Sequence, residues 1–83
     1  NIFSNVRISP MPTTDGYVDV QVELGEAAPL DMTLYTTGGA TVSSRSDATD
    51  TYFATKVYLP SPGVCLLTLR SGDHEKTVKL IRK

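Results

Sequence analysis

The stretch Tyr17-Val-Asp-Val-Gln-Val-Glu-Leu24 alternates between polar and apolar residues over its whole length. Successive side chains of a β-strand point to opposite faces of the sheet, so the apolar side chains share one face and the polar ones the other. Such a pattern predicts a strand that has one face toward a core and one face toward water. The stretch therefore indicates a β-fold.

The same alternation returns further along the chain. Leu30, Met32 and Leu34 occupy alternate positions, and residues 51–59 repeat the pattern. Helical periodicity is nowhere sustained for the roughly ten residues that a helix needs. Residues 63–70 are apolar at positions of both faces, so we expect a central strand that is covered on both sides.

Clusters of glycine, proline, serine and aspartate separate these stretches at turn spacing. The strands are predicted at residues 6–9, 17–24, 30–36, 40–44, 51–59, 63–71 and 75–82. Several short strands in fewer than about 100 residues are typical of an immunoglobulin-like antiparallel β-sandwich. An up-and-down barrel is the alternative topology. We expect residues 1–83 to form a single domain, cut from a longer protein.

Composition excludes several classes of protein. Of the 83 residues, 40% are hydrophobic and 20% are charged, which is typical of a folded domain. The net charge of -1 argues against a nucleic-acid partner, since such binders show a basic excess. The charge is uneven, because residues 70–83 hold five bases and two acids, and the rest of the chain three bases and seven acids. No apolar run approaches the roughly 20 residues of a transmembrane helix, and no signal-peptide pattern opens the chain.

The sequence offers little for catalysis or metal binding. Cys65 lies in the most apolar predicted strand and His74 in a turn, so we expect a buried, inert thiol and a solvated imidazole. One Cys and one His do not complete a zinc site, and Asp47 and Asp50 lack the ligand spacing of a calcium loop. We expect no enzymatic activity, no cofactor and no metal, and a lone cysteine forms no intramolecular disulfide.

The terminal segment 76–83 carries the basic excess on an alternating pattern. It is either an edge strand whose lysines prevent unwanted sheet pairing, or a strand that a partner recognises through its edge or its basic end. An exposed edge also permits a homodimer by strand pairing between two copies.

Four blocks follow one another along the chain. They are a turn with two prolines and a glycine (Pro10, Pro12, Gly16), an apolar strand with a tyrosine and a later glycine (Tyr35, Gly39), a Leu-Pro-x-x-Gly segment before an apolar strand (Leu59, Pro60, Gly63, Cys65), and a glycine turn before a lysine-rich end (Gly72, then residues 76–83). This order resembles the type A C-terminal sorting domain of proteins exported by the type IX secretion system of Bacteroidetes. Met11 stands where that family usually has Asn, and Cys65 where it has Tyr.

The resemblance implies a non-catalytic secretion signal. A cargo that carries it crosses the inner membrane by its own signal peptide, passes through the periplasm, and is recognised by the type IX machinery of the outer membrane. It then reaches the cell surface or the medium. In many cargos a sortase removes the domain and joins the cargo to an anionic lipopolysaccharide. The residues expected to be recognised are Gly63, Gly72, Lys76, Lys79, Leu80, Ile81, Arg82 and Lys83.

Two other functions remain open on the residues alone. An immunoglobulin-like carbohydrate-binding or adhesion module of an extracellular protein would use exposed aromatic side chains, and Tyr35, Tyr52 and Tyr58 are candidates, although the chain has no Trp. A purely structural spacer would tolerate replacement of its basic terminal strand.

Overall fold

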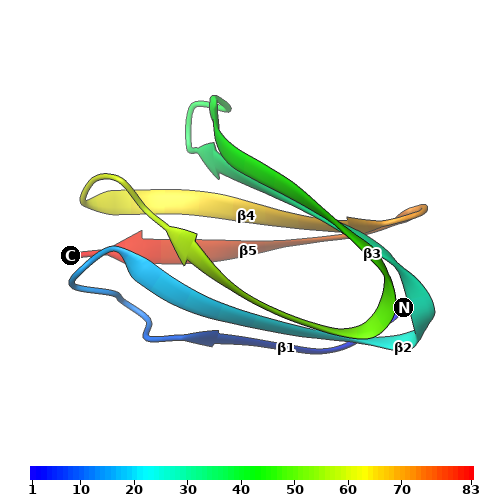
Figure 1. Cartoon of the computed structure of the whole chain (residues 1–83). Helices are drawn as coiled ribbons and strands as arrows, with labels where there is room; N and C mark the ends of the chain where they lie inside the picture. The colour runs from blue at the N-terminus through cyan, green and yellow to red at the C-terminus, as the bar shows by residue number, and fades with distance from the viewer.

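The computed structural model describes residues 1–83 and consists of β-strands and their connections (Figure 1). The strands are β1 (Phe3–Ser9), β2 (Tyr17–Thr36), β3 (Thr41–Tyr58), β4 (Gly63–Ser71) and β5 (His74–Arg82). They form one sheet in the order β1-β2-β4-β5, with β3 also paired to β2, and all of these pairings are antiparallel. The all-β antiparallel prediction is confirmed, with five strands where about seven were expected. No helix is long and apolar enough to cross a bilayer.

Two of the predicted breaks lie inside continuous strands. The residues of segments 25–29 and 45–50 were expected to form connections, but β2 and β3 run through them. The register between β2 and β3 shifts between Glu23 and Ala28 and again between Ala28 and Leu30. Bulges of this kind bend a strand pair and leave it paired on either side. The turn-forming residues there therefore mark a bend of a long hairpin.

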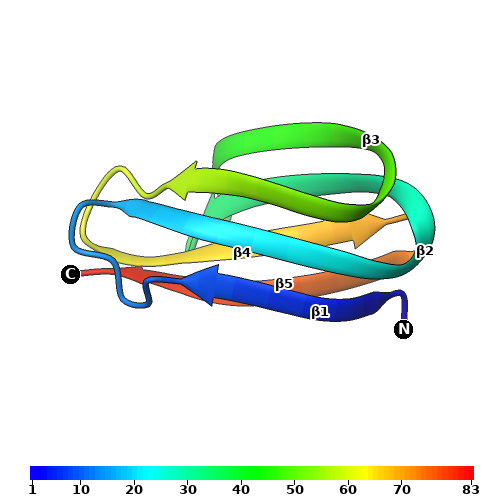
Figure 2. The same ribbon diagram turned by 60° about the horizontal axis from the view of Figure 1, so that its bottom comes forward.

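The bend gives the two halves of β2 different neighbours. Residues 17–24 pair with β1 and with residues 52–58 of β3. Residues 31–36 pair with β4 and with the first part of β3. The sheet thereby curls over itself (Figure 2). We call β1 with the adjoining halves of β2 and β3 the three-stranded half, and the other halves with β4 and β5 the four-stranded half.

The core lies between the two halves. The alternate apolar residues Val18, Val20 and Val22 of the first half are 0% exposed, as are Leu69 and Leu80 of the second. Sixteen buried hydrophobic residues form one cluster. The alternation along residues 17–24 therefore predicted the buried face correctly.

β4 is flanked by β2 and β5, as its apolar sequence predicted. The expectation that both its faces are covered is wrong. Cys65, Leu67 and Leu69 are buried, whereas Val64 on the other face is 38% exposed. A chain this short curls its sheet over only one face of β4, and the other face stays in contact with water.

Candidate recognition surface at the C-terminal strand

The end of β5 lies beside two connections that are distant in sequence (Figure 1). The Thr13 amide donates to the carbonyl oxygen of Ile81 at 2.9 Å, and the Lys83 amide donates to the carbonyl oxygen of Thr13 at 2.9 Å. Arg82 Nη1 donates to the carbonyl oxygen of Leu59 at 2.8 Å. The first, third and fourth sequence blocks thus meet at one end of the molecule.

Thr13 organises the first of these connections. Its side chain is 0% exposed, and its hydroxyl oxygen lies 2.9 Å from the carbonyl oxygen of Tyr17 and accepts the Gly16 amide at 3.2 Å. The Tyr17 amide donates to the carboxylate of Asp15 at 2.9 Å. This hydrogen bond, followed by one from Thr13, lowers the pKa of Asp15. The connection is therefore a hydrogen-bonded turn that presents Thr13 to β5.

Gly16 is required by close packing at this end. Its φ is 93°, and a Cβ there would lie 2.7 Å from Tyr58 Cε1 and 2.8 Å from the carbonyl oxygen of Leu59. The Leu59 amide also donates to the Gly16 carbonyl oxygen at 2.8 Å. Only glycine combines a left-handed backbone with such a close approach of two segments.

Two of the residues expected to be recognised are held by the fold. Leu80 is 0% exposed and belongs to the core. Arg82 is half-buried, and its guanidinium carbon lies 5.6 Å from the centre of the Tyr58 ring. The Nε of Arg82 is buried without a hydrogen-bond partner. Leu80 and Arg82 therefore fix the end of β5 in place, and their side chains are not freely presented to a partner.

The remaining terminal residues face solvent. Val64 lies opposite Ile81, and Leu66 opposite Lys79, on the outer face of the four-stranded half. Lys79 and Lys83 are exposed and Ile81 is half-buried. The sulfur of Met11, itself 38% exposed, lies 3.2 Å from the amide nitrogen of Ile81. We call this surface, which combines apolar side chains with two lysines, the terminal patch: Met11, Val64, Leu66, Lys79, Ile81 and Lys83.

The terminal patch adjoins a free strand edge. In an antiparallel strand, both backbone groups of one residue point to the same side, and the side alternates along the chain. Ile81 and Lys83 use their outward groups to pair with Thr13. By the same alternation Glu75, Thr77 and Lys79 direct theirs outward, where no strand is paired. The outer edge of β5 is therefore hydrogen-bonded to Thr13 at the C-terminal end and unpaired from Glu75 to Lys79.

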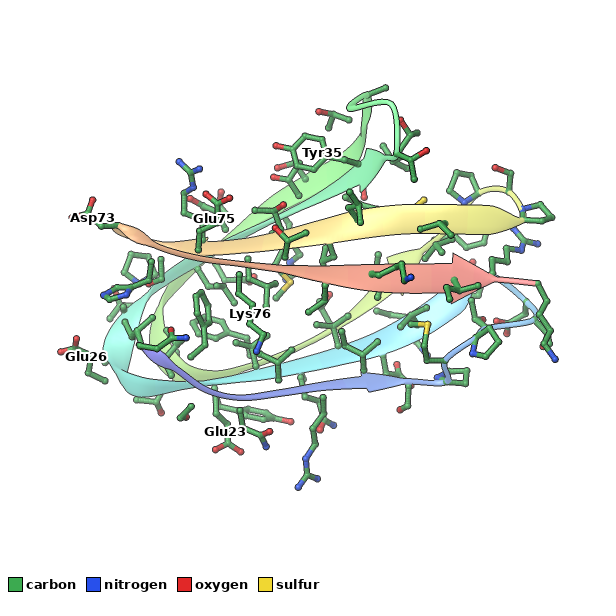
Figure 3. The ribbon with its side chains drawn as sticks, turned by 180° about the vertical axis from the view of Figure 1, so that it is seen from behind. Glu23, Glu26, Tyr35, Asp73, Glu75 and Lys76 are labelled. Carbon is green, nitrogen blue, oxygen red and sulfur yellow. The ribbon has the colours of Figure 1, made fainter.

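The other predicted positions are spread along the fold. Gly39 and Gly72 lie in turns and Gly63 is the first residue of β4. All three have a positive φ, and open space surrounds the position of a Cβ at each. Pro10 and Pro12 follow cis peptide bonds and are exposed, as is Pro60. Tyr35 is half-buried, and Cys65 is buried. Gly72 and Lys76 lie at the far end of the β4–β5 hairpin from Lys83, and Figure 3 shows Lys76 on the side of β5 toward β1.

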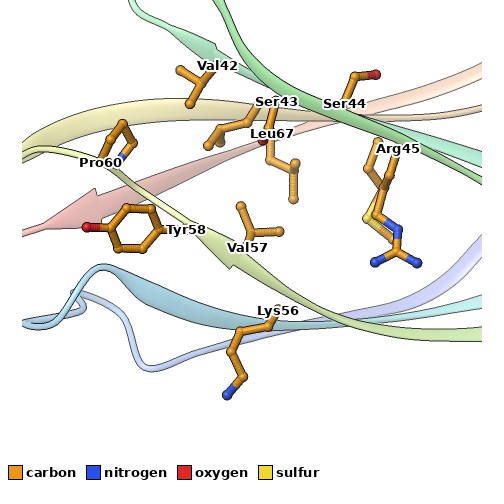
Figure 4. Close-up of a pocket in the computed structure, with 11 residues that line it drawn as sticks. Val42, Ser43, Ser44, Arg45, Lys56, Val57, Tyr58, Pro60 and Leu67 are labelled. Atoms are coloured by element: carbon orange, nitrogen blue, oxygen red, sulfur yellow. The ribbon is translucent and has the colours of Figure 1, made fainter.

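A groove of about 540 Å³, which sequence patterns did not indicate, lies between the two halves of β3 (Figure 4). Its lining includes the core residues Met32, Leu34 and Leu67, and Arg45 extends across it. Arg45 forms an ion pair with Asp47 at 2.8 Å and donates a hydrogen bond to the Thr55 hydroxyl. An inward-pointing charge of this kind protects the edge of a sheet from pairing with other strands. The lining contains no carboxylate, thiol or imidazole.

Elsewhere no three His, Cys, Asp or Glu side chains gather in a way that could hold a metal ion. Cys65 is 7% exposed and His74 lies at the start of β5 next to the turn.

Comparison with models of known protein families finds no match, and neither does a search of curated proteins.

Proposed function

We propose that this domain is a non-catalytic secretion signal that directs a cargo protein across the outer membrane through the type IX secretion system. One observation carries the proposal: three of the four blocks of the family resemblance meet at the end of β5, next to an exposed basic and apolar patch. Because these blocks are far apart in sequence and meet in space, we infer that they have one role in common, which is to hold the terminal strand so that a receptor can bind it.

The proposal includes an immunoglobulin-like β-sandwich. In such domains two packed layers of antiparallel strands enclose one core. The pairing supports this arrangement. β1 pairs with β2 in the three-stranded half, whereas Thr13, which follows β1 in the chain, pairs with β5 in the four-stranded half. On this interpretation each bent strand of the long hairpin counts as two strands, one in each layer.

Recognition would use the free edge and the two lysines together. A partner strand that adds to β5 gains affinity from main-chain hydrogen bonds and specificity from side-chain contacts. Lys79 and Lys83 favour a partner that is acidic at this point, since complementary charge guides and orients association. The apolar members of the terminal patch, such as Val64 at 38% exposure, supply area to bury. The same edge allows two copies to pair as a homodimer.

After export, the cargo would reside at the cell surface or in the medium, having passed through the periplasm. Removal of the domain by a sortase, with attachment of the cargo to anionic lipopolysaccharide, belongs to the same proposal. The domain itself contributes binding and no chemistry to these steps, and it needs no cofactor.

The test is a reporter carried to the periplasm and fused to residues 1–83 in a bacterium with a type IX system. Deletion of residues 79–83 would remove the core residue Leu80, so export would fail even if recognition lay elsewhere. Charge reversal at exposed positions is sharper: Lys79→Glu with Lys83→Glu. The matched control is Arg7→Glu with Lys56→Glu, which changes the charge equally on exposed residues of the three-stranded half.

We expect the first variant to lose most surface display of the reporter, and the control to keep it. The Lys79→Glu, Lys83→Glu variant should retain the thermal transition of the parent domain, because both side chains are exposed and form no ion pair. The control should lose at most about 1 kcal/mol of stability, since Lys56→Glu places a like charge opposite Asp19. Equal display by the two variants would contradict the proposal.

A further inference from the structure

The outer face of the three-stranded half carries three tyrosines and lies away from the terminal patch. Tyr17 and Tyr52 are each 48% exposed, and Tyr58 is 44% exposed. Tyr17 lies opposite Tyr58, with ring centres 4.8 Å apart and planes inclined by 42°. Exposed aromatic side chains grouped on one face are a common feature of binding surfaces. We call this surface the tyrosine face: Arg7, Tyr17, Asp19, Gln21, Glu23, Tyr52, Ala54, Lys56 and Tyr58.

The aromatic rings stand at the two ends of the tyrosine face. Tyr52 and Tyr58 are six residues apart on β3, so they share one side of the strand. At a rise of about 3.3 Å per residue their Cα atoms are about 20 Å apart. Tyr58 contacts Arg82 as well as Tyr17, and its ring lies next to Gly16. Tyr17 and Tyr52, the two most exposed tyrosines, are therefore the rings proposed for stacking, one at each end.

A shallow polar depression lies between the rings. It has a volume of about 330 Å³, and its lining includes Asp19, Gln21, Ala54 and Lys56. Arg7, Gln21 and Ala54 form one cross-strand row, in which the small Ala54 leaves room above the sheet. The exposed guanidinium and amide groups of Arg7 and Gln21 offer several hydrogen-bond donors and one acceptor.

The charges on this face balance. Arg7 and Lys56 are matched by Asp19 and Glu23, and Lys56 forms an ion pair with Asp19 at 3.2 Å. A phosphate-rich ligand or a strongly charged peptide would find no complementary excess. Charge complementarity therefore favours an uncharged ligand that has apolar faces for the rings and many hydroxyl groups for the polar side chains.

We propose that the tyrosine face binds an extended, neutral oligosaccharide of pyranose units. Sugar rings stack on Tyr17 and Tyr52 through their C–H faces, and intervening hydroxyls bond to Gln21 and Arg7. A span of about 20 Å accommodates a few sugar units of an extended chain. This activity is independent of the secretion signal, because it uses the opposite outer face of the curled sheet.

The structure changes which tyrosines belong together. Tyr35, Tyr52 and Tyr58 were the candidates from sequence, but Tyr35 lies on β2 opposite Leu66, on the outer face of the four-stranded half. Tyr17 takes its place beside Tyr58. Tyr35→Ala is therefore a matched control for Tyr52→Ala, since it removes the same side chain from the other face.

The experiment is a titration of the ¹⁵N-labelled chain, followed by backbone amide chemical shifts, with cellohexaose, xylohexaose, mannohexaose and chitohexaose as separate probes. At least one of them should give saturable shifts centred on Tyr17, Gln21 and Tyr52. Tyr52→Ala and Tyr17→Ala should each weaken its binding about tenfold, which corresponds to about 1.4 kcal/mol. Tyr35→Ala should leave the affinity unchanged.

Three results would overturn the proposal: no saturable shift with any of the four sugars, shifts that map to the Tyr35 side, or equal weakening by Tyr35→Ala. Concentration-dependent dimers that bury Tyr52 in the absence of sugar would assign the face to a second copy of the chain and overturn it as well. The spectra of the unliganded variants show whether each has kept its fold, and Tyr52→Phe, which keeps the ring, should retain binding.

Discussion

The two outer faces of the curled sheet share one core and yet present different chemistry. The four-stranded half shows Val64, Ile81 and the lysines of the terminal patch near the end of β5. The three-stranded half shows paired charges between exposed tyrosines. Inner positions are constrained by packing, and outer positions are free to differ because most substitutions there alter stability little. Function in this domain is therefore expected on the outer faces, with the core and the connections holding them in place.

The largest expected effect tests the division between inner and outer positions on β5 itself. Leu80 is 0% exposed, whereas its neighbour Ile81 points to the other face. Leu80→Ala should lower the free energy of unfolding by about 3 kcal/mol through lost burial and a cavity. Ile81→Ala should cost less than about 1 kcal/mol. Urea unfolding followed by circular dichroism measures both, and equal losses would mean that β5 does not have one buried and one open face.

The next effect concerns the connection that holds β5. Gly16→Ala forces a side chain into the left-handed region and against Tyr58 and Leu59, at 2.7 and 2.8 Å. We expect a loss of at least about 2 kcal/mol in unfolding free energy. Gly39→Ala, at a similar φ of 92° but with open space around it, should cost about 1 kcal/mol. If the two variants were equally stable, the close approach at Gly16 would not contribute to the loss of stability.

The smallest effect is a pH dependence at the same connection. The Tyr17 amide and the Thr13 hydroxyl lower the pKa of Asp15 in the folded state. A lowered folded pKa stabilises the fold above the unfolded value of about 4, and this contribution is lost as pH falls through the folded pKa. Asp15→Asn should therefore be slightly less stable than the parent at neutral pH. The gap in urea midpoints should narrow as pH falls below about 4, and a gap that did not narrow would assign the effect to packing.

Alternation and turn residues predicted much of this fold. Residues 63–71 and 17–24 are paired as expected, because the period of two is a local property that burial of one face preserves. The bend at residues 25–29 was predicted as a loop, since glycine and proline occur both in turns and in bulged strands. No local sequence feature distinguishes a turn from a bulged strand at these residues.

The contacts around the candidate sites could not be predicted from local sequence patterns. Thr13 pairs with the strand end through a bridge between residues 69 positions apart, and no periodicity marks it. The grouping of Tyr17 with Tyr58 depends on register across a long hairpin. Lysine enrichment at residues 76–83 was visible from the start, but the structure separates exposed Lys79 from the buried Leu80 beside it.

The most direct measurement of the central claim is site-specific photocrosslinking during export. A photoreactive residue at position 79 lies on the open edge of β5, and one at position 7 lies on the opposite outer face. The proposed function predicts that the probe at position 79 forms an adduct with an outer-membrane component of the type IX machinery, and that the probe at position 7 does not. Adducts of equal yield from both positions, or from position 7 alone, would contradict recognition through the C-terminal strand.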